Sequence, residues 1–239
     1  MWCKNCNIET NEKKCPICGE ETVEDIPTEV YWCDECQVPV MQEITQADKG
    51  ICPRCGKPMK YMSADIRPIF PKERLLVEIL LKKKPYQWAE CSVWASNNRY
   101  YINGKSIALS SKLFKEADAD GYIEQLHKYE DANPHDFFDT NIKTFIEANQ
   151  MRLDYLIDEA HRFIKKTAEK FPEENIVLSF SGGKDSTVTA DLAIKALSDP
   201  NLVHIFGNTT LEFPITLEYA ERYRKNHPQA IFKVAKNNE

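Results

Sequence analysis

The segment that most constrains the fold lies between an apolar run and an amphipathic helix pattern. Ile176-Val177-Leu178 is typical of a buried parallel strand, and the polar segment SFSGGKDST follows it at 179–187. Behind this segment, apolar residues recur at helical spacing from Val188 to Leu197. Glycines permit close backbone approach, and the first N–H groups of a helix attract anions. The combination therefore predicts an α/β fold with a phosphate site at the turn.

The predicted phosphate-binding residues all lie in this turn and the helix start; they are Ser181, Gly182, Gly183, Lys184, Asp185 and Ser186. The spacing is not that of a Walker A loop. A lysine at the positive end of a helix dipole is unfavourable unless an anion lies between it and the backbone. The alternative interpretation is a chance Gly-Gly turn whose charged residues are ordinary solvated helix-start residues.

The segment 181–186 resembles the PP-loop of the adenine-nucleotide α-hydrolase superfamily, in which Ser-Gly-Gly-x-Asp-Ser holds nucleotide phosphates. After the next apolar run, the segment 208–216 (NTTLEFPIT) resembles the corresponding motif of the phosphoadenosine phosphosulfate (PAPS) reductase family. That family has Asp, Gly and Glu where this chain has Asn208, Thr210 and Ile215. The resemblance covers roughly residues 150–239, and the three departures concern the fine substrate contacts.

The resemblance implies an enzyme of sulfur metabolism that binds an adenylyl nucleotide, either ATP or PAPS. Two chemistries fit: an ATP pyrophosphatase-type adenylation or sulfurtransfer, and reduction of PAPS by a cysteine. The intact Ser-Gly-Gly-Lys-Asp-Ser segment is more similar to the ATP-using members, with Mg²⁺ bridging the phosphates near Asp185. The family's cysteine nucleophile cannot be assigned here because no cysteine follows Cys91, so the catalytic residues stay unknown. Cys91 itself is expected to pack as a small apolar side chain.

Eight of the nine cysteines form four Cys-x-x-Cys pairs near the N-terminus. Such pairs present two thiolates on one tight turn, as tetrahedral Zn²⁺ requires. The simplest pairing is sequential and predicts two structural zinc ribbons; the ligands are Cys3, Cys6, Cys15 and Cys18 for the first and Cys33, Cys36, Cys52 and Cys55 for the second. A crossed pairing stays open. Disulfides are the alternative, and a reducing compartment disfavours them.

Charge decides what the zinc ribbons are expected to contact. Residues 1–63 carry seven Lys/Arg against eleven Asp/Glu, and each Zn(Cys)₄ site adds about two negative charges. A broad nucleic-acid surface for tRNA or DNA is therefore not supported, although a local patch at Lys57 and Lys60 stays open. A scaffold or protein-contact role is favoured. The alternative function is a zinc-ribbon module for nucleic acid or protein with a non-catalytic nucleotide loop.

The chain is expected to be cytoplasmic. No apolar run approaches the ~18 residues of a membrane span, and the first residues, MWCK, lack the apolar core of a signal peptide. The formal net charge is −6 and 42% of the residues are hydrophobic, which is ordinary for a globular protein.

Four domains are expected: ribbon 1 at 1–24, ribbon 2 at 25–63, a small α+β module at 64–130, and a helical lead-in with the start of a doubly wound parallel-sheet PP-loop domain at 131–239. In the module, Asn103-Gly104 predicts a hairpin. Its aromatic residues are expected to pack a small sheet, with base stacking as the alternative; they are Trp88, Trp94, Tyr100 and Tyr101. Pro134 is expected near the first turn of a helix, and a long amphipathic helix follows from Met151.

Three strands are expected in the last domain, at 176–180, 202–206 and 230–235. A sheet of this superfamily normally has about five strands. We therefore expect a further C-terminal segment or a protein partner to complete the sheet.

Overall fold

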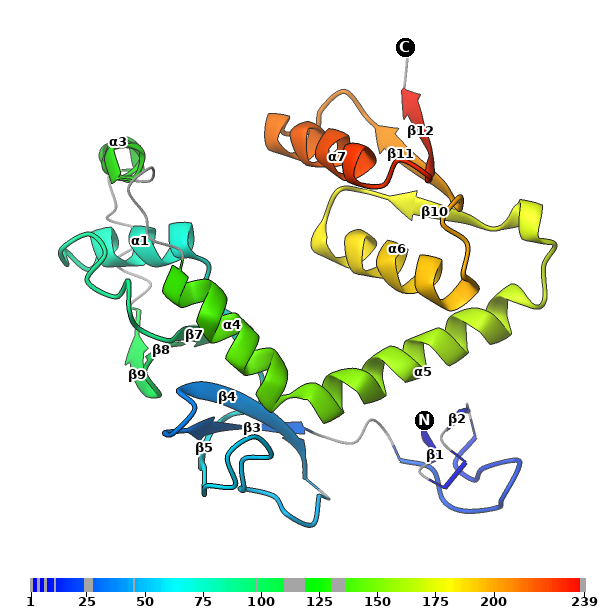
Figure 1. Cartoon of the computed structure of the whole chain (residues 1–239), viewed down its shortest axis with the longest axis horizontal. Helices are drawn as coiled ribbons and strands as arrows, with labels where there is room; N and C mark the ends of the chain where they lie inside the picture. The colour runs from blue at the N-terminus through cyan, green and yellow to red at the C-terminus, as the bar shows by residue number, and fades with distance from the viewer. Residues whose placement is uncertain are drawn as a thin grey trace. The chain divides into compact units, whose positions relative to one another are not determined.

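The computed structural model describes residues 2–3, 5–6, 8–10, 12–23, 28–44, 46–97, 99–109, 119–129 and 136–236. The chain divides into two compact units, Met1–Arg152 and Leu153–Glu239 (Figure 1). Helix α5 (Gln150–Ala168) begins in the first unit and continues into the second. The four domain limits expected from the sequence stay predictions, and the expected helix start at Pro134 lies outside the described residues.

The first unit begins with two small antiparallel sheets that carry the cysteine pairs. Strands β1 (Trp2–Cys3) and β2 (Ile8–Glu9) form the first pair. The second sheet has the order β4-β3-β5 and consists of β3 (Thr28–Cys33), β4 (Val38–Glu43) and β5 (Lys60–Ser63). Cys33 and Val38 are paired at the end of the β3–β4 hairpin, so the turn between them presents one Cys-x-x-Cys pair.

A four-stranded antiparallel sheet and three helices complete this unit. Its order is β6-β7-β8-β9, from β6 (Arg67–Pro68), β7 (Val93–Ser96), β8 (Arg99–Ile102) and β9 (Lys105–Ala108). The helices are α1 (Pro71–Leu80), α3 (Ala119–Tyr129) and α4 (Asp136–Ala148). The predicted hairpin is confirmed, because Asn103 and Gly104 join β8 to β9 with φ of 46° and 76°, as a type I′ turn requires. A Cβ on Gly104 would lie 2.5 Å from the Trp32 ring, so the turn also needs glycine for this approach.

The aromatic side chains of this unit form its core. Trp32, Trp94 and Tyr101 make one buried cluster, and Trp88 belongs to a second. The Trp94 and Phe145 rings lie 4.7 Å apart between centroids, which joins β7 to α4. Aromatic rings bury a large apolar area each and dominate the energetics of a core. Packing is therefore the role of Trp88, Trp94 and Tyr101, and base stacking on them is excluded by their burial.

Helix α4 holds the second cysteine sheet and the four-stranded sheet together. Asn141 Nδ2 donates to the Gln37 carbonyl at 3.0 Å, and its Oδ1 accepts from Ser92 Oγ at 2.9 Å. Just after the helix, Asn149 Oδ1 accepts from the backbone N–H of Met41 at 2.7 Å. Both asparagines are buried, so each polar group would be costly to leave unpaired.

The second unit is a parallel α/β sheet, as the sequence predicts. Its strand order is β10-β11-β12, with α6 and α7 as the connections (Figure 1). The elements are β10 (Val177–Phe180), α6 (Lys184–Leu197), β11 (Val203–Asn208), α7 (Pro214–Asn226) and β12 (Ile231–Lys236). A short 3₁₀ turn, Glu173–Asn175, precedes the first strand. Each strand lies within two residues of its expected position.

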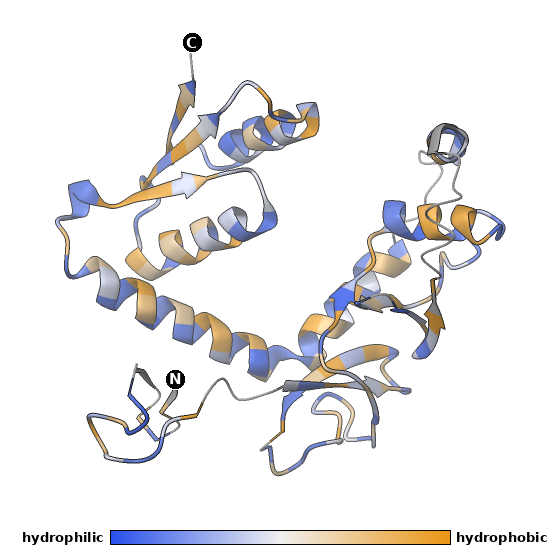
Figure 2. Ribbon diagram, turned by 180° about the vertical axis from the view of Figure 1, so that it is seen from behind, coloured by the Kyte–Doolittle hydropathy of each residue, from blue (hydrophilic) through white to orange (hydrophobic). Residues whose placement is uncertain are grey.

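One hydrophobic cluster packs the two helices on this sheet. Small residues of α6, Ala190 and Ala193, face Phe180 and Phe206 of the strands, and the strands are largely hydrophobic in colour in Figure 2. His204 is fully buried beside them, with Nδ1 2.7 Å from the Leu202 carbonyl oxygen. Burial lowers the pKa of His204, so it is a neutral core residue. The carboxyl ends of β10 and β11 meet at one edge, where the predicted loop lies.

Helix α5 is the longest helix of the described residues and corresponds to the amphipathic helix expected from Met151. Its apolar residues are interrupted by charged ones such as Lys165 and Lys166. Among the described helices, none combines the length and apolar character needed to cross a bilayer.

Candidate functional site: a glycine turn on a parallel sheet and two four-cysteine clusters

Hydroxyl groups close the turn between β10 and α6. The backbone N–H of Ser181 donates to Ser186 Oγ at 3.2 Å, and the two serine Oγ atoms lie 3.1 Å apart. Ser186 Oγ donates to the Gly183 carbonyl at 3.0 Å. The Gly183 N–H lies 3.4 Å from Ser181 Oγ. The six residues predicted from the sequence therefore form one compact turn.

Helix α6 begins at this turn, directly after the carboxyl end of β10. Gly183 is the N-cap, and Lys184 is the first helical residue. The N–H groups of a helix's first turn have no intrahelical acceptor, so they can bind an anion. The Lys184 Nζ lies 3.1 Å from Asp185 Oδ1, with both side chains about nine-tenths exposed. An exposed pair of this kind contributes little to stability, so the ammonium group is available to a bound phosphate.

The two glycines have different roles in the turn. Gly182 has a φ of 74°, and a Cβ there would lie 3.1 Å from Thr216 Cγ2 and 3.5 Å from the Thr216 carbonyl oxygen. Gly183 has a φ of −85°, and a Cβ there would meet only Ser181 Oγ at 3.5 Å. The fold therefore requires glycine at position 182. At position 183 the fold would accept a Cβ, and the absence of a side chain there leaves open space above the turn.

The second sequence motif lies beside the first. Thr216, in the first turn of α7, contacts Gly182 as described, and Tyr219 OH lies 3.0 Å from Thr187 Oγ1 of α6. Within the motif, Thr209 Oγ1 donates to Glu212 Oε1 at 2.9 Å. Sequence reasoning found the motif but missed Tyr219. The available signal was the position of Tyr219 five residues after Pro214, which is about one and a half turns into α7.

The eight N-terminal cysteines form two clusters with the sequential pairing predicted above. The ligand atoms of Cys3, Cys6, Cys15 and Cys18 lie within 4.8 Å of one another, as do those of Cys33, Cys36, Cys52 and Cys55. The grouping agrees with the sequential pairing, and metal binding by these cysteines stays a prediction. No residue of either cluster belongs to a disulfide in the described part of the chain.

The sulfur separations fit a tetrahedral metal. Cys3 and Cys18 Sγ are 3.5 Å apart, and Cys33 and Cys55 Sγ are also 3.5 Å apart. A zinc ion with Zn–S bonds of about 2.3 Å needs sulfurs about 3.8 Å apart, whereas a disulfide bond is about 2.05 Å long. Four thiolates with this spacing are a donor set typical of structural Zn²⁺.

The Cys-Pro-x-Cys-Gly turns share one backbone pattern. The Gly19 N–H donates to the Cys15 carbonyl at 2.9 Å, and the Gly56 N–H donates to the Cys52 carbonyl at 2.8 Å. Both glycines have positive φ, 76° and 70°, which an L side chain disfavours. Glycine therefore suits the residue after the second cysteine of each of these turns. A third turn places Gln37 at the equivalent position, with φ of 55°.

Thiols crowded in this way do not ionise uniformly without a metal. The hydrogen bond that the Cys6 thiol donates to Cys18 Sγ, together with burial, raises the pKa of Cys6 to about 12. The pKa of Cys18 is lowered to about 6, mainly because its Sγ accepts a hydrogen bond from the backbone N–H of Glu20. Zinc must displace the remaining protons, so its binding strengthens as pH rises. Cys91, outside both clusters, is partly buried and its pKa is raised by burial, which fits the packing role expected for it.

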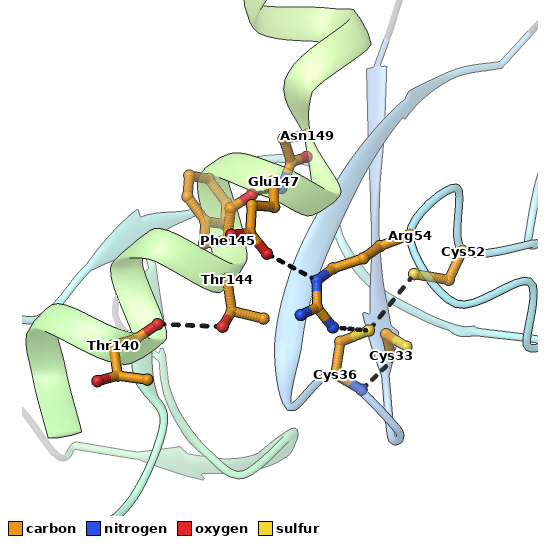
Figure 3. A network of polar contacts seen from close by, with 9 residues as sticks. All are labelled: Cys33, Cys36, Cys52, Arg54, Thr140, Thr144, Phe145, Glu147 and Asn149. Atoms are coloured by element: carbon orange, nitrogen blue, oxygen red, sulfur yellow. Dashed lines mark hydrogen bonds and ion pairs between the residues drawn. The ribbon is translucent and has the colours of Figure 1, made fainter.

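Arg54 connects the second cluster to helix α4 (Figure 3). Its Nη1 donates to Cys36 Sγ at 3.6 Å, and its Nε donates to Glu147 Oε2 at 3.0 Å. Ala148, next to Glu147, packs directly on the cysteines. A guanidinium beside the thiolates offsets the negative charge of a Zn(Cys)₄ centre, and such outer contacts hold metal ligands in place. Sequence reasoning missed Arg54 and Glu147, because 93 residues separate them.

Arg54→Gln is expected to release zinc from the second cluster faster than the parent chain does. It removes both the charge beside Cys36 and the bond to Glu147, and losses of outer contacts typically weaken metal binding about 10- to 100-fold. Zinc transfer to a chromophoric chelator measures the release. Lys57→Gln is the control, because it removes the same charge from an exposed position of the same ribbon. Equal release from the two variants would contradict this role for Arg54.

Comparison with known proteins finds one family model that matches most of the second unit. Residues 175–239 match the Phosphoadenosine phosphosulfate reductase domain. This range contains the three parallel strands, helices α6 and α7 and both sequence motifs. The resemblance read from the two motifs is therefore confirmed.

Two proteins of Methanocaldococcus jannaschii are similar to this chain over shorter stretches. Uncharacterized protein MJ0066 is 31% identical over 117 residues, which are 49% of this chain and 24% of that protein. Uncharacterized protein MJ0973 is 35% identical over 88 residues, 36% of this chain and 21% of that protein. The chain thus spans about a quarter or less of the length of these relatives. No solved structure matches the chain.

Proposed function

Because residues 175–239 match the phosphoadenosine phosphosulfate reductase domain, we propose that the turn 181–186 holds the phosphates of an adenylyl nucleotide in a reaction of sulfur metabolism. One observation carries the proposal. The turn joins the carboxyl end of a parallel strand to a helix N-terminus, and an exposed lysine stands beside it. Ligands of open α/β sheets bind at this edge.

ATP is favoured over PAPS as the nucleotide. The intact Ser-Gly-Gly-Lys-Asp-Ser segment at 181–186 is more similar to the ATP-using members of the superfamily than to the reductases. Cys91 does not supply the thiolate that reduction of PAPS needs, because burial raises its pKa and keeps the thiol protonated. With ATP, cleavage between the α and β phosphates transfers adenylate to an acceptor and releases pyrophosphate.

The residues of the turn have distinct tasks in this reaction. The first N–H groups of α6 and the Lys184 ammonium stabilise the charge that develops on the leaving pyrophosphate. The Ser181 and Ser186 hydroxyls orient the turn through their bonds to each other and to Gly183. The Asp185 carboxylate would hold a Mg²⁺ ion directly or through a water molecule, since hard cations take oxygen ligands.

The four-cysteine clusters act as structural zinc centres in this proposal. Their cysteines are largely buried and replace much of a hydrophobic core in the ribbons. Thiolate zinc sites persist in a reducing compartment such as the cytoplasm. A module that binds nucleic acid or protein, with a non-catalytic loop, is the competing function, and the nucleotide experiment separates the two.

Lys184→Ala is expected to weaken nucleotide binding about ten- to more than a hundredfold. A charge-assisted phosphate contact typically contributes ~1.5–3 kcal/mol. Calorimetric titration of the purified chain with ATP and with PAPS, each with and without Mg²⁺, measures the change and decides between the nucleotides.

Lys195→Ala is the matched control for this titration. Lys195 lies on the same helix and is exposed, and its ion pair with Asp191 is of the i,i+4 kind. We expect it to bind nucleotide as the parent does. The proposal fails if the parent binds neither nucleotide, or if Lys184→Ala and Lys195→Ala bind equally well.

A further inference from the structure

Three consecutive lysines follow helix α1, and none of them has an ion-pair partner among the residues that the structure describes. Lys82, Lys83 and Lys84 are exposed, and the loop that carries them is hydrophilic in Figure 2. No carboxylate of the described residues forms a salt bridge with them. Neighbouring like charges repel one another, and an anion bound beside them would relieve this repulsion.

A buried carboxylate fixes the backbone that displays these lysines. Glu78 has no exposed surface, and its two oxygens accept the backbone N–H groups of Tyr86 and Trp88 at 2.6 Å each. The Lys83 N–H donates to the Glu78 carbonyl at 2.8 Å. Lys82 adopts a φ of 54° at the end of the helix. The loop is thus held in one conformation, which lowers the entropy lost when a ligand binds.

The lysines border a hollow between α1 and α3. Its volume is about 410 Å³, within the range of ligand sites. Helix α3 contributes Gly121 and three side chains at i, i+3 and i+7, which lie on one helical face; they are Tyr122, Gln125 and Tyr129. Ile79 and Pro85 form an apolar part of the lining. Lys128 Nζ lies 5.4 Å from the Tyr129 ring centroid.

The chemistry of the hollow selects a particular kind of anion. The carboxyl end of α1 is the negative end of its dipole, which disfavours a compact phosphate ion bound by the backbone. The positive charge comes from side chains instead, and it stands beside aromatic rings. Lysines that follow a phosphate backbone, with aromatic rings on which bases stack, are the two elements of single-strand binding sites.

Regional charge agrees with this ligand. Residues 64–130 carry eleven Lys/Arg against nine Asp/Glu, whereas residues 1–63 carry seven against eleven. The acidic charge that disfavours nucleic acid belongs to residues 1–63 and not to the module that contains the hollow.

We propose that the hollow between α1 and α3 binds a short single-stranded segment of nucleic acid, with phosphates at Lys82 and Lys83 and bases stacked on Tyr122 and Tyr129. This site lies in the first unit and is independent of nucleotide binding by the turn 181–186. RNA and DNA share the required chemistry, so the experiment includes both.

Fluorescence anisotropy with labelled single strands of about twelve nucleotides, one of RNA and one of DNA, tests the proposal on the full chain. Titrations run at about 50 and about 200 mM salt, since phosphate contacts make binding salt-dependent. Lys82→Gln/Lys83→Gln is expected to reduce the slope of log affinity against log salt by about 1.4, from two lost phosphate contacts. Lys165→Gln/Lys166→Gln, an exposed adjacent pair on α5, is expected to bind as the parent does.

A second pair of variants tests stacking. Tyr122→Ala is expected to weaken binding about five- to more than a hundredfold, and Tyr122→Phe to stay near the parent value because it keeps the ring. Far-UV circular dichroism and zinc content check that each variant is folded. The proposal is overturned if neither strand binds at the lower salt, if the two lysine pairs behave alike, if Tyr122→Ala binds as Tyr122→Phe does, or if inorganic polyphosphate competes as well as an unlabelled strand.

Discussion

Cys33→Ser is expected to lose one zinc ion per chain and to unfold the second zinc ribbon. Cys33 is completely buried, and the cluster around it contains only a few apolar side chains besides the cysteines. Too little apolar surface is buried there to hold the sheet without the metal. Structural zinc contributes apparent free energies of about 10–16 kcal/mol in small zinc domains, so this is the largest stability change we expect in the chain.

The effect is expected to spread beyond the ribbon. Trp32, the residue before Cys33, packs with Trp94 of the four-stranded sheet. Ala148 of α4 packs on the cysteines, and the Arg54–Glu147 pair lies beside it. Loss of the metal is therefore expected to weaken the packing between β3, β7 and α4. Tryptophan fluorescence should report this loosening together with thermal unfolding.

Elemental mass spectrometry and thermal melting measure the two parts of this prediction. We expect about two zinc ions in the parent chain and about one in Cys33→Ser. Cys91→Ser is the control, since Cys91 lies outside both clusters; it should keep both ions and melt close to the parent. Retention of both ions by Cys33→Ser, or an unchanged melting temperature, would refute the assignment of the cluster as a structural zinc site.

Local pattern was sufficient to predict much of this molecule. The cysteine spacing predicted both clusters, because each pair closes a turn whose geometry depends on a few neighbouring residues. The Asn103-Gly104 turn was predictable for the same reason, since positive φ at two successive residues restricts the residue types. The three parallel strands were predictable from short apolar runs bounded by turn residues.

Contacts between distant segments were not predictable from the sequence alone. Asn149 accepts a hydrogen bond from the backbone of β4, more than a hundred residues earlier in the chain. No local pattern distinguishes it from an ordinary residue at a helix end. The glycine turn shows the same limit. The sequence indicated both glycines equally, and only the position of Thr216, from another element, shows that Gly182 is the one the fold requires.

Gly182→Val is expected to destabilise the second unit and to abolish nucleotide binding. At a φ of 74° an L side chain costs ~1–2 kcal/mol, and the added Cβ would lie 3.1 Å from Thr216 Cγ2. The Thr216 carbonyl oxygen at 3.5 Å leaves little room for the two further methyl groups of valine. The turn must shift to relieve these contacts, which displaces the N–H groups and Lys184 from a bound phosphate.

Two glycine variants separate the effect on folding from the effect on binding. Gly207→Ala is the folding control, because no heavy atom lies within 4 Å of a Cβ there and its φ is not positive; it should melt and bind close to the parent. Gly183→Ala meets only Ser181 Oγ at 3.5 Å, so it should keep the fold while its methyl group hinders the approach of a phosphate. Chemical unfolding and calorimetry with ATP, run on all three variants, then give a clear order. Gly182→Val should lose both stability and affinity, Gly183→Ala mainly affinity, and Gly207→Ala neither. If the free energy of unfolding and the ATP affinity of Gly182→Val both equal those of the parent, the turn is not the constrained phosphate site that its geometry predicts.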